Sequence, residues 1–277
     1  MTKTKTYPTI LDSIRLLIIM LALFGFSYAI IQFIDNLYNT DFINTPYAEI
    51  FMIILSEGFI IFYATKKSKL LYKDIFSFKK ISPVVLISIA IFSTGMNIIL
   101  SEFDNIIQSI CSNCNHGHNT LESGFTNQNM FIAAIIIPVI IAPILEELIF
   151  RGIILNGYLK NYSKLTSIII SSLFFSLMHF EIGQSFQAFW SSLFFAWIYI
   201  KTNSLFSNIF AHFLSNSLHR ILTYIFNINI TGFNLNTDLV VHQPLCFDLL
   251  GIFLILLGSL LFVKLFGKNN NPNFNQI

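Results

Sequence analysis

Charged residues are scarce in this chain. Lys, Arg, Asp and Glu together make up 11% of its 277 residues, whereas a soluble domain contains about 25%. So low a content excludes a soluble enzyme, a disordered chain and a nucleic-acid-binding protein, because all three need more charge. The formal net charge of +2 indicates no acidic partner.

Cysteine, proline and glycine are sparse as well. Three cysteines are too few for a disulfide scaffold, and 7 prolines with 12 glycines leave no low-complexity linker. Hydrophobic residues, by contrast, make up 55% of the chain, and 31 residues are phenylalanine. This composition is typical of a protein that lies in a lipid bilayer.

Eight apolar runs approach or exceed the ~20 residues that a helix needs to cross a bilayer. They are residues 16–33, 48–65, 83–101, 129–158, 165–180, 183–200, 205–226 and 245–266. The sequence therefore predicts an all-α polytopic membrane protein. We expect about eight transmembrane helices in one bundle with an intramembrane polar cavity.

Basic residues collect in every second loop. The loop from 66 to 82 holds six lysines, and the later loops on that side hold Lys160, Lys164 and Lys201, while the alternate loops hold neither Lys nor Arg. Because Lys and Arg are enriched on the cytoplasmic side, we expect a multi-pass cell-membrane protein with both termini in the cytoplasm. The Phe-rich, Asn-rich composition with Lys over Arg favours a bacterial source.

Three charged side chains lie within six residues of the fourth apolar run: Glu146, Glu147 and Arg151. A charge inside a membrane helix costs about 2.5–3.5 kcal/mol unless it is partnered. Glu147 and Arg151 are four residues apart and lie on one helix face, so they can pair. Glu146 lies about 100° around the helix with no local partner. A purely structural ion pair is the alternative to a functional site.

Two later motifs place further polar side chains in apolar runs. A Phe-x-x-x-His motif joins Phe175 and His179, and a His-x-x-x-Asn motif puts His212 and Asn216 on one helix face. Glu146 and His179 lie equally far from the polar turn at residues 160–164, so a helical hairpin would bring them to equal depth.

His212 fits this arrangement less well, because it lies only about 10 Å from the side on which that turn lies. A kink at Pro138 or Pro143 would close the difference in depth. A helix that breaks after Gly152 and continues along the membrane surface would close it equally well.

The ordered motifs Glu-Glu-x-x-Phe-Arg-Gly, Phe-x-x-x-His and His-x-x-x-Asn resemble those of the CPBP or Abi family of intramembrane peptidases. This family includes type II CAAX prenyl endopeptidases, lysostaphin-resistance-like proteins and bacteriocin-immunity proteins. The resemblance implies a peptidase core at residues 129–226. Residues 1–128 would then form the N-terminal membrane helices and an outer loop. Residues 227–277 would form a second outer loop, the last helix and a cytoplasmic tail.

The resemblance also implies an activity, the hydrolysis of a peptide bond in a membrane-associated protein or peptide. By motif position, Glu146 is the general base, His179 shares the attacking water, and His212 with Asn216 stabilises the oxyanion. The supporting residues implied in the same way are Glu147, Arg151 and Phe175.

No cofactor is favoured, and a glutamate-driven mechanism is preferred over a metal-dependent one. Zinc, with Glu146, His179 and His212 as ligands, is the alternative. The motifs differ from the His-Glu-x-x-His of common zinc peptidases. A non-catalytic membrane scaffold or bacteriocin-immunity protein is the alternative function, whereas a transporter would need an inverted repeat that the sequence lacks.

Two further groups of polar residues lie outside these motifs. An outer loop contains four residues of zinc-binding type, for which the compact spacing favours a disulfide or an ordinary loop over zinc; they are Cys111, Cys114, His116 and His118. Glu57 and Arg220 lie inside apolar runs, and a structural pair between them is favoured over a place in the polar cavity.

Overall fold

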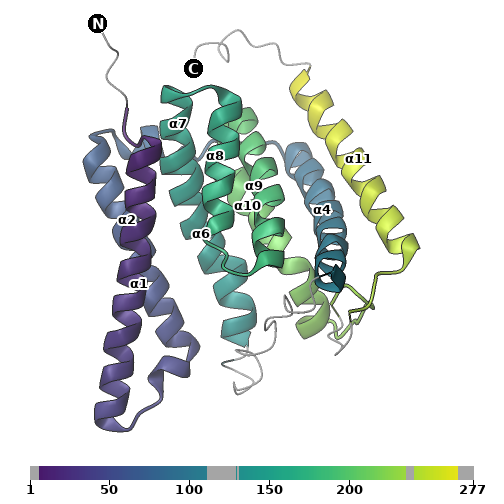
Figure 1. The fold of residues 1–277 in the computed structure, drawn as a ribbon. Coiled ribbons are helices and arrows are strands. Elements are labelled where there is room, and N and C mark those ends of the chain that lie inside the picture. The colour runs from purple at the N-terminus through teal and green to yellow at the C-terminus, as the bar shows by residue number, and fades with distance from the viewer. Residues whose placement is uncertain (1–5, 111–128, 130, 235–239, 268–277) are drawn as a thin grey trace, which may run out of the picture. The chain divides into compact units, whose positions relative to one another are not determined.

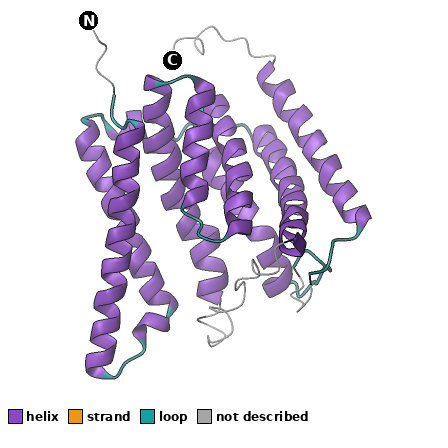
Figure 2. Ribbon diagram, in the orientation of Figure 1, coloured by secondary structure: helices purple, strands orange, loops and turns teal. Residues whose placement is uncertain are grey.

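The computed structural model describes residues 6–110, 129, 131–234 and 240–267. Helices make up almost all of this part, in which no β-strand occurs (Figure 2). The chain is therefore an all-α polytopic membrane protein, as the sequence predicted. The loop with Cys111, Cys114, His116 and His118 lies outside the described residues.

The chain divides into two compact units. Unit 1 comprises residues 1–77 and 119–167, and unit 2 comprises residues 78–118 and 168–277. Each unit contains a part of the segment 129–226. The division into the three regions 1–128, 129–226 and 227–277 stays a prediction.

Five helices of the described part are long and apolar enough to cross a bilayer, so the predicted count of eight was wrong by this measure. They are α1 (Ile10–Tyr38), α2 (Pro46–Ser68), α4 (Pro83–Ile110), the continuous helix from 132 to 161, and α11 (Leu245–Gly267) (Figure 1).

The three remaining helices fall short for separate reasons. The helix α8 (Lys164–Leu177) has 14 residues, which extend only about 21 Å. The helix α9 (Ile182–Thr202) has 21 residues but includes Gln184 and Gln187, and α10 (Leu205–Arg220) has 16 residues. The apolar run 165–180 had merged α8 with the turn that follows it.

In unit 1, α1 and α2 pack side by side as a helical hairpin. Thr9 and Asp12 form a capping box at the start of α1. At the turn, the Asp35 carboxylate accepts hydrogen bonds from Thr40 Oγ1 at 2.5 Å and from the backbone N–H of Ile43 at 2.7 Å. A short 3-10 helix, η1 (Phe42–Asn44), leads into α2.

The third long helix of unit 1 is continuous but irregular. It consists of η2 (Ile132–Ile141), α6 (Ala142–Glu147), η3 (Leu148–Leu155) and α7 (Asn156–Asn161), and both η2 and η3 are π-helical. Pro138 lies within η2. Proline cannot donate the backbone hydrogen bond of a regular helix, and π-turns accommodate such interruptions. The helix continues past Gly152, so the break that the sequence allowed after this residue does not occur.

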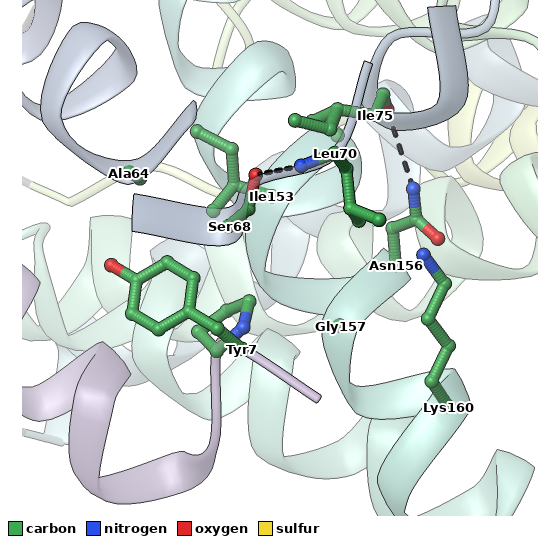
Figure 3. A pocket seen from close by; sticks show the side chains of 11 residues that line it. Tyr7, Ala64, Ser68, Leu70, Ile75, Ile153, Asn156, Gly157 and Lys160 are labelled. Atoms are coloured by element: carbon green, nitrogen blue, oxygen red, sulfur yellow. Dashed lines mark hydrogen bonds between the residues drawn. The ribbon is translucent and has the colours of Figure 1, made fainter. Parts of the chain in front are cut away.

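The N-terminal segment is fastened to the end of this helix. The Asn161 side chain accepts a hydrogen bond from the N–H of Thr6 at 2.8 Å and donates one to the carbonyl of Thr6 at 2.5 Å. A Cβ atom at Gly157 would lie 2.3 Å from Pro8. Tyr7 thereby enters a cavity between α2 and α7, which Figure 3 shows.

Unit 2 is built around a core to which four helices contribute. The core residues come from α4, α9, α10 and α11 and are Val85, Ile89, Phe194, Phe195, Ile198, Ala211 and Phe262. A π-helical turn, η4 (Ile221–Ile225), extends α10. Within this core, the buried Asn208 side chain donates a hydrogen bond to the backbone carbonyl of Phe195 at 2.7 Å, which joins α10 to α9.

Candidate active site

Unit 1 carries a buried ion pair where α6 passes into η3. The Arg151 Nη1 atom donates to Glu147 Oε1 at 2.9 Å, and the two residues are 1% and 0% exposed. A guanidinium and a carboxylate withdrawn from solvent stabilise each other, whereas either charge alone would be strongly unfavourable. The predicted pairing is confirmed, and its supporting role in catalysis stays a prediction.

Glu146 is half-buried on the same helix and lies near other charged residues. It interacts electrostatically with Arg151, which also interacts with Glu147. It interacts as well with Glu57 of α2, a helix that packs against α6. The proximity of Glu57 was missed in the sequence, although its charge inside an apolar run had marked it as unusual.

In unit 2, Phe175 and His179 lie at the end of α8. The His179 Nδ1 atom is 3.0 Å from the carbonyl oxygen of Phe175, and the two rings are 5.0 Å apart. Because a carbonyl oxygen only accepts hydrogen bonds, Nδ1 carries the proton. The Nε2 atom of the neutral ring is then the one that accepts a proton or binds a metal.

His212 contacts the same phenylalanine. Its ring is 5.7 Å from that of Phe175 and 5.0 Å from that of Phe195, and the residue is 5% exposed. Phe175 therefore contacts both histidines. The difference in depth expected for His212 therefore does not keep its ring from sharing this contact with His179.

Asn216 follows His212 by one helical turn and is half-buried. Its backbone carbonyl accepts a hydrogen bond from Arg220 Nη1 at 3.1 Å. The predicted pair of Arg220 with Glu57 stays a prediction, because these residues belong to different units.

The two units each hold one part of the predicted site. Unit 1 holds Glu146 with the buried pair, and unit 2 holds His179 and His212, whose rings both contact Phe175. The predicted approach of Glu146 to His179 stays a prediction. The same is true of zinc, whose candidate ligands come from both units.

A comparison with protein families matches residues 128–218 to the model of Rce1-like type II CAAX prenyl endopeptidases. The matched segment is about a third of the chain and contains all the motif residues. No curated protein and no solved structure matches the chain. Residues 128–218 are thus similar to the Rce1-like type II CAAX prenyl endopeptidases, which confirms the family resemblance expected from the three motifs.

Proposed function

We propose that this chain is an intramembrane endopeptidase that hydrolyses a peptide bond of a membrane-associated protein or peptide. One observation carries the proposal: the family match at residues 128–218 includes Glu146, His179 and His212 with their supporting residues. The buried Glu147–Arg151 pair supports it, because a membrane helix holds such charges only at a cost that a function justifies.

In the proposed reaction, one water attacks the peptide carbonyl carbon. Glu146 and His179 share this water and take its proton as the carbon–oxygen bond forms. The Nδ1 hydrogen bond of His179 to the Phe175 carbonyl supports this role, because it leaves Nε2 as the acceptor. His179 then gives the proton to the leaving nitrogen, the carbon–nitrogen bond breaks, and a carboxylate and an amine result.

His212 and Asn216 are proposed to stabilise the negative charge on the oxygen of the tetrahedral intermediate. They lie one turn apart on α10, and Phe175 and Phe195 hold the His212 ring in place. A single donor of this kind contributes about 3–4 kcal/mol in soluble hydrolases. The buried Glu147–Arg151 pair is proposed to stabilise the helix beside Glu146 without taking part in proton transfer.

The test uses the purified full chain in lipid nanodiscs with a fluorogenic peptide that ends in a prenylated CAAX sequence. The same peptide without the prenyl group serves as a second probe. Glu146→Gln should lower kcat about 100- to 10,000-fold, because the water loses its base. Glu181→Gln, at the start of α9, removes an acid outside the motifs and is the matched control.

The assay is repeated after dialysis against a strong chelator. Undiminished cleavage supports the metal-free mechanism, whereas activity that is lost and then restored by one equivalent of zinc assigns Glu146, His179 and His212 as ligands. If neither peptide is cleaved and Glu146→Gln keeps the biological output of the wild type, the chain is a scaffold or immunity protein and the proposal is wrong.

A further inference from the structure

Glu57 is a buried acid that the proposed reaction does not use. It lies near the middle of α2, a helix long and apolar enough to cross a bilayer. Its Oε2 atom is buried and has no hydrogen-bond partner within the part of the chain that the structure describes. A buried polar atom without a hydrogen bond lowers the stability of the fold. A structural role alone therefore does not explain an acid at position 57.

The packing of unit 1 places Glu57 at the level of Glu146. Ala64 of α2 and Ile153 of η3 line one cavity (Figure 3). The two helices run in the same direction (Figure 1). Glu57 precedes Ala64 by seven residues, which is about two helical turns, and Glu146 precedes Ile153 by the same number of residues.

The two carboxyl groups also interact electrostatically, in agreement with this register. Helix α2 contacts η2, α6 and η3 along its length. The charged residues described as interacting here in unit 1 include Glu57, Glu146, Glu147 and Arg151. Arg151 forms its ion pair with Glu147 and also interacts electrostatically with Glu146, while Glu146 and Glu57 act on each other.

Two carboxylates at short range repel strongly where the dielectric constant is low. A pair of acids in such a place lowers its energy by sharing one proton, and it then titrates as a unit. A pair with one proton offers both a hydrogen-bond donor and a base, which is the combination that water activation requires.

We propose that Glu57 is a positioning residue for Glu146, with the two carboxyl groups sharing one proton. The neutral member of the pair donates a hydrogen bond, directly or through the bound water, and thereby orients the carboxylate that activates this water. The inference rests on the proposed function for its catalytic consequence, but the pairing itself has a test that needs no activity.

The first test compares variants of Glu57 in the peptide-cleavage assay. Glu57→Leu removes both the donor and the proton and should lower kcat at least about tenfold with little change in KM. Glu57→Gln keeps a donor but cannot release a proton, so its loss of kcat should be smaller. The matched control is Glu49→Leu, which removes a half-buried acid two turns earlier on the same helix. Equal kinetics for Glu57→Leu and Glu49→Leu would overturn the positioning role.

The second test is a double-mutant cycle read from melting temperatures in nanodiscs. The shifts of Glu57→Gln and Glu146→Gln should fail to add in the double variant, by at least about 2 °C, because each substitution removes the other acid's partner. The shifts of Glu49→Gln and Glu146→Gln should add.

The two tests separate the pairing from the proposed function. A coupled cycle, together with no cleavage of either peptide and an unchanged biological output of Glu146→Gln, supports the Glu57–Glu146 pair and overturns the peptidase proposal. An additive cycle refutes the pair, whether or not the chain cleaves peptides.

Discussion

The Glu147–Arg151 ion pair stabilises two charges inside a membrane helix. Both side chains are withdrawn from solvent, and Arg151 Nη1 donates a hydrogen bond to Glu147 Oε1 at 2.9 Å. Such a pair adds little folding stability compared with two apolar residues at the same positions, but removing one partner lowers the stability strongly. Its contribution is therefore measured by removing first one residue and then both.

We expect Arg151→Leu to destabilise the protein by about 3–5 kcal/mol, because it leaves the Glu147 carboxylate buried without its cation. Thermal unfolding in nanodiscs measures the change. The double variant Arg151→Leu, Glu147→Leu should recover most of the lost stability. A double variant as unstable as the single one would show that the pair does not act as a unit.

At the scale of elements, the contact between α4 and α11 depends on glycine. A Cβ atom at Gly95 would lie 2.6 Å from the carbonyl oxygen of Gly251 and 2.9 Å from Leu254 Cβ. At Gly258 it would lie 2.6 Å from the backbone nitrogen of Phe92. Small residues let membrane helices approach until their backbones touch, so these positions set the spacing of the two helices.

Gly95→Ala should therefore force α4 and α11 apart and cost about 1–3 kcal/mol of unfolding free energy. The matched control is Gly25→Ala in α1, where a new Cβ atom meets nothing within 4 Å. That substitution should leave stability unchanged or raise it by up to about 1 kcal/mol through better helix propensity. Equal melting temperatures for the two variants would contradict the tight packing of α4 on α11.

At the scale of the whole molecule, the one-sided distribution of lysine predicts the orientation in the membrane. Single cysteines are introduced into a variant whose three native cysteines are serine. Lys66→Cys, in the last turn of α2, and Ser163→Cys, in the turn after α7, should be protected from an impermeant thiol reagent in intact cells, because both lie on the lysine-rich side. Asp41→Cys, at the opposite end of the α1–α2 hairpin, should react.

The opposite pattern, with Lys66→Cys labelled and Asp41→Cys protected, would reverse the orientation. Labelling after the cells are permeabilised controls for accessibility, since all three positions are exposed side chains.

Much of the fold and part of the site followed from the sequence. Long apolar runs required membrane helices, and the four-residue spacing of Glu147 and Arg151 required a shared face, because the helical period is fixed. The predicted count of eight spans was wrong because α8 has only 14 residues and because α9 and α10 contain polar side chains that lower their hydropathy. Hydropathy averages over a window and does not register where a helix ends.

The sequence by itself determined the class of protein, the three motifs and the pairing within one helix, since these depend on composition and on local spacing. Tertiary structure decided that a π-helical segment carries the chain through Pro138 and past Gly152. It also placed His179 and His212 around Phe175 and brought Glu57 to the level of Glu146. Contacts of this kind join residues far apart in the chain, and their register depends on how whole helices pack, which no local spacing specifies.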